Sequence, residues 1–121
     1  LFPYTTLFRS HILKSMDIES GRCAILFPHG ILNRDAEVHM RIKLIEEDYV
    51  ETIIGIGDHL FYNSAMSACI VICRMNKCTS RKGKIQFIDA SSLVTRSNGE
   101  SYLTPEHIEE IKKLYNELNS N

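Results

Sequence analysis

The segment Pro28-His29-Gly30 follows an apolar run and is the first candidate for binding chemistry in this chain. Ligands of open α/β sheets bind outside the carboxyl ends of the strands, and we expect this segment to lie at such an end. Gly30 would permit a close approach of a ligand to the backbone, because glycine has no Cβ atom. His29 could donate a hydrogen bond to a nucleic-acid base or to a phosphate; the alternative is a solvated loop histidine.

Four cysteines could indicate disulfides, a metal site or neither: Cys23, Cys69, Cys73 and Cys78. They form no Cys-x-x-Cys pair, and no histidine lies at zinc-finger spacing. The first three lie inside apolar runs. We therefore expect no metal, and we interpret these three as small buried side chains, as thiols are in a reducing compartment.

Basic side chains gather in the stretch from Arg74 to Lys84, which also contains Lys77. Arg81, Lys82 and Lys84 could contact phosphates, and each such contact would make binding salt-dependent. The alternative is a solvated loop between two strands. Asp89 ends the next apolar run, but no second acid is placed to pair with it, so we expect it to cap the following turn.

Length and composition limit the class of protein. The chain has 121 residues, of which 44% are hydrophobic and 24% charged, and a formal net charge of −1. These values predict a single globular unit and no global basic field for tight, non-specific nucleic-acid binding. The longest apolar run is far shorter than the roughly 20 residues that span a bilayer, so we expect a cytoplasmic protein without membrane contact.

Strands alternate with helices along the chain. Residues 11–20 show helical spacing and stop at Gly21, and the run 22–28 reads as a strand covered on both faces of a parallel sheet. We expect Asp35 to cap a helix over Ala36–Glu47 whose buried face carries Val38, Ile42 and Ile45.

The second half of the chain predicts three more strands, over 49–57, 68–75 and 84–90. The first two should pair antiparallel, since their connection is too short for a crossover helix. Thr104 and Pro105 should start the last helix, whose buried stripe would be Ile108, Ile111, Leu114, Tyr115 and Leu118. The predicted fold class is α/β, the C-terminal half of a doubly wound Rossmann-like sheet with an antiparallel strand pair.

Four ordered blocks carry a resemblance to a known family: GRCAILFPHGIL, EVHMRIKLIEEDYVETIIGI, LFYNS and RKGKIQFIDASS. From about Leu13 to about Tyr115, the chain resembles the C-terminal part of the catalytic domain in the modification subunit of type I restriction–modification systems. These subunits are N-6 adenine DNA methylases that use S-adenosylmethionine. The resemblance implies that the intact protein transfers a methyl group to adenine in double-stranded DNA.

The resemblance also implies what this chain lacks. The family holds S-adenosylmethionine in a Gly-rich loop and centres its chemistry on an Asn-Pro-Pro-aromatic motif, and neither occurs here. We therefore expect the cofactor site upstream, no catalytic residue in this chain and no activity of the chain alone. The implied partners are double-stranded DNA and a separate specificity subunit that reads the sequence, with or without a restriction subunit of the same system.

Related methyltransferases flip the target base into a pocket with aromatic walls. The resemblance places Phe61 and Tyr62 at that pocket, with Asn63 and Ser64 beside them; the alternative is that the two aromatics plug the sheet edge. Three positions depart from the family pattern. His29 stands where Asn is frequent, which favours the solvated loop histidine. Gly57 stands where Pro is frequent and Ala65-Met66-Ser67 replaces a segment that usually carries Ile-Pro, and we expect these two departures to loosen the loop before and after residues 60–64.

Residues 1–10, LFPYTTLFRS, resemble the conceptual translation of a sequencing adapter, so we expect them to be a scar outside the fold. Residues 11–121 would then be the partial, C-terminal methylase domain. The alternative function is a small non-catalytic α/β module, complete in itself, that binds a protein partner through residues 60–64 and the last helix.

Overall fold

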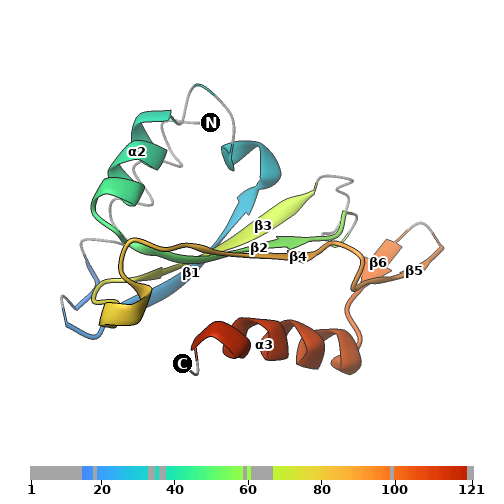
Figure 1. Ribbon diagram of the computed structural model, residues 1–121. Helices are drawn as coiled ribbons and strands as arrows, with labels where there is room; N and C mark the ends of the chain where they lie inside the picture. The colour runs from blue at the N-terminus through green and yellow to red at the C-terminus, as the bar shows by residue number, and fades with distance from the viewer. Residues whose placement is uncertain are drawn as a thin grey trace.

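The computed structural model describes residues 15–17, 19–32, 35, 38–58, 60, 67–98 and 100–119. These residues form a four-stranded sheet with the strand order β1-β3-β2-β4. The strands are β1 (Arg22–Pro28), β2 (Val50–Ile56), β3 (Ala68–Arg74) and β4 (Gln86–Ala90). A long helix lies on each face of the sheet, α2 (Val38–Glu46) on one and α3 (Pro105–Asn119) on the other (Figure 1). This mixed α/β architecture confirms the predicted fold class.

Strand β3 runs antiparallel to both of its neighbours, whereas β2 and β4 pair in parallel. The antiparallel pairing of β2 with β3 is therefore as predicted. The environment predicted for β1 is wrong, because β1 pairs antiparallel with β3 and has no parallel neighbour among the described strands. Although β1 and β2 point the same way, β3 lies between them.

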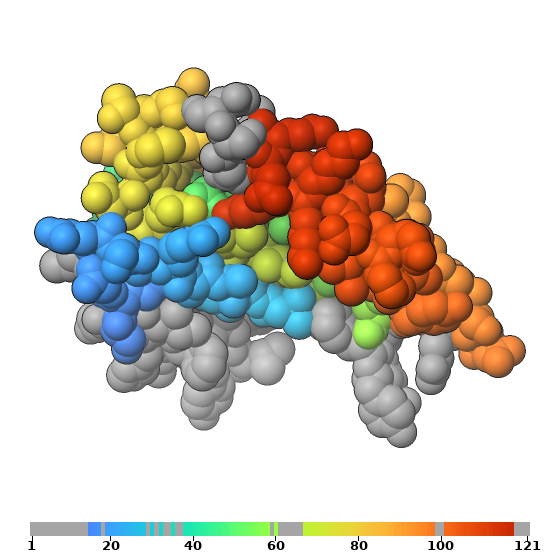
Figure 2. Space-filling model, turned by 90° about the horizontal axis from the view of Figure 1, so that it is seen from below, coloured from blue at the N-terminus to red at the C-terminus, as the bar shows by residue number. Residues whose placement is uncertain are grey.

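The burial of β1 follows from its position at the edge of the described sheet. Arg22, Ala24 and Leu26 are exposed, and Leu26 keeps 50% of its surface. Figure 2 shows β1 (blue) at the surface beside α3 (red). One face of β1 is therefore open, whereas continuous burial on both faces is typical of the inner strands of a sheet.

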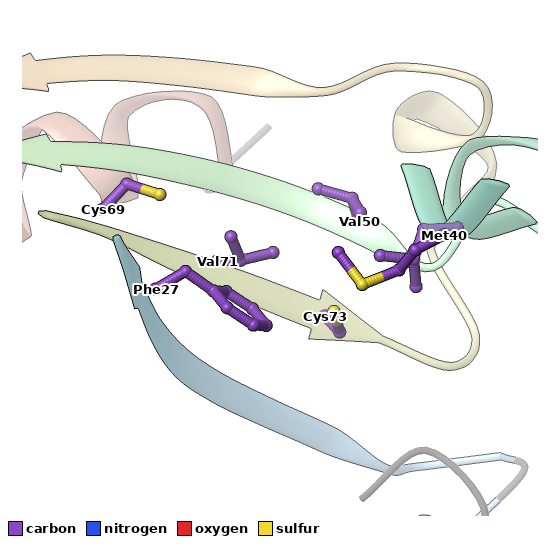
Figure 3. Close-up of a cluster of buried hydrophobic side chains, with 7 residues drawn as sticks. Phe27, Met40, Val50, Cys69, Val71 and Cys73 are labelled. Carbon is purple, nitrogen blue, oxygen red and sulfur yellow. The ribbon is translucent and has the colours of Figure 1, made fainter. Parts of the chain in front are cut away.

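The core on the α2 face is a cluster of buried side chains from α2 and three strands (Figure 3). Helix α2 contributes Met40 and Leu44, which are 6% exposed. The predicted stripe is wrong for Ile42 and Ile45, which are 47% and 58% exposed. At about 100° per residue, Met40 and Leu44 lie on one side of this helix, whereas Ile42 and Ile45 lie on the roughly opposite side, and the sheet buries only the first side. The predicted Asp35 cap involves residues 36 and 37, outside the described residues.

The core on the α3 face is built from Ile54, Ile56, Ala68, Ile88 and Ala90, and Ile111, Leu114 and Tyr115 of α3 pack against it. Ile108 was predicted in this stripe, but it is 41% exposed. The Leu118 side chain lies outside the described residues.

The start of α3 is as predicted, and a reciprocal pair of hydrogen bonds fixes it. The His107 amide donates to Thr104 Oγ1, and the Thr104 amide donates to His107 Nδ1, both at 3.2 Å. This is the geometry of a capping box with histidine at the third helical position. Pro105 occupies the first position, where no amide hydrogen is needed.

A short hairpin of β5 (Thr95–Ser97) and β6 (Glu100–Tyr102) precedes α3 and was not predicted. Its signal is Asn98-Gly99, a favoured pair for tight turns, and Asn98 has the positive φ of 53° that such turns use. Across the described part of the chain, no helix combines the length and apolar character needed to cross a membrane.

Candidate functional site

Strands β1, β2 and β4 point the same way and end at one edge of the sheet, and β3 begins there. The pairing register aligns Pro28, Ala68, Ile56 and Ala90 in one row across the sheet. In open α/β folds this carboxyl edge is where ligands bind. We call it the carboxyl edge below.

A hollow of about 620 Å³ opens at the carboxyl edge. Leu32, Ile53 and Phe87 give it apolar surface, and its polar groups come from Ser67, Asp89 and Ser91. Gly55, Ile56 and Ile88 complete the lining, although Ile56 and Ile88 are buried in the α3-side core. An apolar floor with a few polar groups at the rim is the usual composition of a site for a small or flat organic group.

Gly57 fixes the end of β2 against the segment that follows β4. A Cβ atom at this position would lie 3.1 Å from the Ser91 carbonyl oxygen and 3.2 Å from Val94 Cγ1. Gly57 is buried, so the absence of a side chain allows the close approach of these two segments. The glycine therefore lets the end of β2 pack against the segment after β4. The prediction that Gly57 loosens the following loop falls on residues 59 and 61–66, which lie outside the described residues.

Asp89 caps the turn after β4, as predicted. Its Oδ1 atom accepts hydrogen bonds from the Ser91 amide at 3.1 Å and from Ser91 Oγ at 2.6 Å. The side chain of Asp58, after β2, instead lies 3.6 Å from Arg96 in a half-exposed ion pair. The carboxyl edge thus carries carboxylates with structural partners. Within the described ranges, no three His, Cys, Asp or Glu side chains are grouped to hold a metal ion.

The predicted segment Pro28-His29-Gly30 lies at the carboxyl edge. Pro28 is the last residue of β1, and His29–Leu32 form a short 3-10 helix whose Leu32 lines the hollow. Gly30 is half-buried, and the His29 side chain lies outside the described residues.

The predicted base-pocket residues Phe61, Tyr62, Asn63 and Ser64 lie outside the described residues. The described residues on either side of them are Leu60, which packs against the α3-side core, and Ser67, which lines the hollow. The described residues that come before and after these four residues in the chain therefore both lie at the carboxyl edge.

The basic stretch lies at the opposite edge of the sheet, before β4 begins. Lys77 is buried, and its Nζ donates to Asp48 Oδ1 at 2.7 Å and to the Lys84 carbonyl at 2.8 Å. Arg81 is 9% exposed, and its Nη2 donates to the Glu51 carbonyl at 3.4 Å. The prediction of a phosphate contact does not suit Arg81, because its guanidinium faces the protein. Lys82 and Lys84 are exposed.

Asp48 anchors this basic loop to the turn before β2. Its second oxygen, Oδ2, accepts a hydrogen bond from the Gly83 amide at 2.9 Å. Burial by itself would raise the pKa of Asp48, but the hydrogen bonds from Lys77 and Gly83 and the nearby positive charges outweigh it and leave the pKa lowered. The loop is thus held by buried charges and is not simply solvated.

A buried carboxylate, Glu51, joins the sheet to α3, and sequence reasoning missed it. Only 2% of Glu51 is exposed. Arg74 Nε and Tyr115 Oη donate hydrogen bonds to its two oxygens, and Arg22 Nη2 donates to Tyr115 Oη at 2.7 Å. The signal was a single charged residue within the otherwise uncharged run of β2.

The pKa values in this cluster follow from its contacts. Burial alone would raise the pKa of Glu51, but the hydrogen bonds from Tyr115 and Arg74, together with the charges of Arg74 and Arg22, bring it below the ordinary value. Burial and the neighbouring Glu51 carboxylate both raise the pKa of Tyr115. Glu51 is therefore ionised and Tyr115 is protonated at neutral pH, which makes the cluster a structural link.

A family model described as "N-6 DNA Methylase" matches residues 4–121. Among curated proteins, the type I restriction enzyme MjaVIII methylase subunit of Methanocaldococcus jannaschii is 33% identical over 101 residues. The MpnII methylase subunit of Mycoplasma pneumoniae is 29% identical over 110 residues. The matches cover 80% and 90% of this chain but only 18% and 20% of those proteins.

Solved structures give the same relationship. The type I restriction-modification methyltransferase subunit of Streptococcus thermophilus superposes with a TM-score of 0.84 at 30% identity, over 92% of this chain and 23% of that one. The M protein of the type I restriction enzyme EcoKI has the same fold, with a TM-score of 0.69 at 15% identity, over 90% of this chain and 24% of that one. The chain thus spans about a fifth to a quarter of the length of these relatives.

Proposed function

Because this chain belongs to the N-6 DNA methylase family, we propose that it is the C-terminal part of the catalytic domain in the modification subunit of a type I restriction–modification system. The intact protein would transfer a methyl group from S-adenosylmethionine to the exocyclic nitrogen of adenine in double-stranded DNA. The observation that carries the proposal is the likeness to the Streptococcus thermophilus subunit, at a TM-score of 0.84 over 92% of the chain.

The described residues do not by themselves fit S-adenosylmethionine. The sequence has no Gly-x-Gly-x-x-Gly turn to receive a nucleotide-like cofactor, and the carboxylates described at the carboxyl edge already have partners. We assign the cofactor site, and with it the methyl donor chemistry, to a part of the protein that this chain does not include. No catalytic step is assigned to residues of this chain.

The role that we assign to this chain is to help hold the target base. An adenine inside a duplex cannot present its amine to a methyl donor, so the base must leave the stack. The hollow at the carboxyl edge offers an apolar floor at Leu32, Ile53 and Phe87, with polar groups from Ser67, Asp89 and Ser91 at its rim. Phe61 and Tyr62 would stack on the base, and Asn63, Ser64 and the Pro28–Gly30 segment would lie beside it.

The proposed partners follow from the type of subunit. The named relatives are methylase subunits of restriction enzymes. We therefore propose that this protein meets double-stranded DNA together with a specificity subunit, which reads the sequence, and a restriction subunit. Such a DNA-modifying assembly would work in the cytoplasm. Exposed Lys82 and Lys84 remain candidates for phosphate contacts, but they lie at the opposite edge of the sheet from the hollow.

The proposal is tested with two proteins, the 121-residue chain and the full-length protein encoded by the same gene. We expect tritiated S-adenosylmethionine to be retained by the full-length protein and not by the chain. With its specificity subunit and DNA, the full-length protein should yield N6-methyladenine, identified by mass spectrometry of the digested DNA. Retention of the cofactor by the chain alone would show that the cofactor site has been misplaced. N4-methylcytosine as the product would contradict the assignment to adenine.

A further inference from the structure

Two cysteines face each other directly across two antiparallel strands. The register of β1 and β3 pairs Cys23 with Cys73, so the two side chains emerge on the same face of the sheet. Neither thiol is in a disulfide in this structure. Cys73 belongs to the core cluster on the α2 face, and Cys23 packs against that cluster. Figure 3 shows Cys73 near the end of β3, where β1 passes beside it.

The Cα spacing at this pair lies within the range of disulfides. The Met75 amide donates to the Gly21 carbonyl at 2.9 Å, which marks residues 21 and 75 as a hydrogen-bonded pair. Such pairs recur every second residue in an antiparallel ladder, so Cys23 and Cys73 form the next one, with Cα atoms about 5.5 Å apart. Disulfides most often join residues whose Cα atoms are about 5.5–6 Å apart. The Cβ atoms of a hydrogen-bonded pair are about 5.5 Å apart, so the two strands must move closer to reach the roughly 3.5–4.5 Å of a disulfide, and the bond that forms is more easily reduced.

The other two cysteines lack this arrangement. Cys69 lies opposite Phe27 on β1 and opposite Gly55 on β2, so no cysteine faces it across either strand. Cys78 is exposed in the loop after β3, with its sulfur 3.4 Å from Ser80 Oγ. The fold therefore selects one of the possible cysteine pairs.

The two members of the pair differ in access to solvent. Cys73 is 1% exposed, whereas Cys23 is only partly buried on the edge strand β1. A small oxidant can therefore reach the sulfur of Cys23 first. Cys73 lies beside it, so the Cys73 sulfur can then attack the oxidised sulfur of Cys23. Burial raises the pKa of the Cys23 thiol, which keeps its thiolate fraction small and makes its reaction with an oxidant slow.

We propose that Cys23 and Cys73 are a redox-sensitive pair that forms a cross-strand disulfide when the protein meets hydrogen peroxide. The Cys23 thiolate attacks one peroxide oxygen, the O–O bond breaks, and the sulfenic acid and one water are formed. Cys73 sulfur then attacks Cys23 sulfur, the S–O bond breaks and a second water leaves. Two thiols lose two electrons to one peroxide, and a dithiol reductant reverses the reaction.

The disulfide would fasten β1 to β3. Strand β1 is the edge strand of the described sheet, so its attachment depends on the β3 ladder and on the side chains that it buries toward α2. Oxidation would link the two strands covalently at the end where β1 begins. We expect the oxidised chain to unfold at a higher urea concentration than the reduced chain.

Peptide mapping tests the proposal. The 121-residue chain, joined to a solubility-enhancing carrier without cysteines, is treated with hydrogen peroxide, blocked with an alkylating agent and digested with trypsin without reduction. The predicted product links peptide 23–34 to peptide 44–74 and loses the mass of two hydrogen atoms. Peptide 44–74 also contains Cys69, so Cys69→Ala must preserve the link and Cys73→Ala must abolish it. Cys78→Ser removes the exposed thiol and should have no effect on the link.

A parallel sample oxidised in urea separates a property of the fold from a property of the sequence. In the native chain the link to Cys73 should predominate, whereas in urea Cys23 should also link to Cys69 and Cys78. The same mixture of pairs under both conditions would overturn the proposal. So would a native chain in which Cys78 becomes oxidised and peptide 23–34 remains alkylated.

Discussion

Glu51 is the residue at which burial and charge conflict most strongly. A carboxylate that is 2% exposed is costly unless its hydrogen bonds are complete, and here Arg74 and Tyr115 occupy its two oxygens. Because these partners come from β3 and α3, the same bonds that satisfy Glu51 also attach the last helix to the sheet. A residue of this kind is weak evidence for catalysis, since its pKa keeps it ionised and its oxygens are taken.

Replacing Glu51 should destabilise the fold. Glu51→Gln leaves the Arg74 guanidinium without its anion, and we expect a loss of about 2–3 kcal/mol in the free energy of unfolding. This is less than for a fully buried pair, because the Arg74 side chain is 32% exposed. Asp58→Asn is the control, since Asp58 and Arg96 are about half-exposed, and it should cost less than about 1 kcal/mol. Equal urea midpoints for the two variants would contradict this account.

Acid should weaken the fold through the same carboxylate. The folded pKa of Glu51 lies below its ordinary value of 4.5, and that of Asp48 lies below 3.8. The stabilisation is therefore present in full above about pH 4.5 and is lost as the pH falls through the folded pKa values. Urea midpoints measured from neutral pH down to about 3 should fall, and the fall should be smaller in Glu51→Gln. A Glu51→Gln variant with an unchanged acid slope would show that other groups carry the effect.

At the scale of elements, the features that the sequence predicted correctly are those set by residues close together in the chain. The β2–β3 pairing follows from a short connection, and the start of α3 follows from Thr104 and Pro105. Other features depend on parts of the chain that are distant in sequence. The insertion of β3 beside β1, the choice of Met40 and Leu44 over Ile42 and Ile45, and the burial of Arg81 all required the sheet to be in place. The carboxyl edge was located from the sequence, but the hollow and the packing of Gly57 were not.

Gly55 lies within β2 and Gly57 directly follows it, and the two should respond differently to substitution by alanine. Gly57→Ala puts a methyl group 3.1 Å from the Ser91 carbonyl, so the loop must shift, and we expect a loss of about 1–2 kcal/mol. Gly55→Ala meets only the Ile88 carbonyl at 3.8 Å, an ordinary contact, and should change stability by less than about 0.5 kcal/mol. Chemical denaturation of both variants measures this difference. A Gly57→Ala variant as stable as Gly55→Ala would contradict the close approach.

At the scale of the whole molecule, the surface keeps large apolar side chains that a self-sufficient domain would cover. Phe87 on β4 is 70% exposed, and Ile42, Ile45 and Leu26 are each about half-exposed. Phe87 also borders an apolar cavity of about 190 Å³ between α2 and the sheet. Exposed apolar patches favour association. The relatives, of which this chain spans 18% and 20%, contain further chain that such surfaces could meet.

Removing one exposed aromatic should improve solubility at little cost in stability. Phe87→Ser should reduce concentration-dependent light scattering of the chain and change the free energy of unfolding by less than about 1 kcal/mol. The neighbouring Ile88 points into the core and is 7% exposed, so Ile88→Ala should cost about 2–4 kcal/mol and worsen association. Identical scattering of Phe87→Ser and the parent chain would show that association begins elsewhere.

The place of β3 between β1 and β2 also sets an order of assembly. During synthesis β1 is made before the other three strands of this sheet, yet its ladder partner β3 is made only after α2 and β2 are complete. The β2–β3 pair closes a shorter loop, so it should nucleate folding, with β1 docking afterwards as a late step. Until then the unpaired backbone groups and the apolar side chains of β1 stay open to chaperones and to other nascent chains.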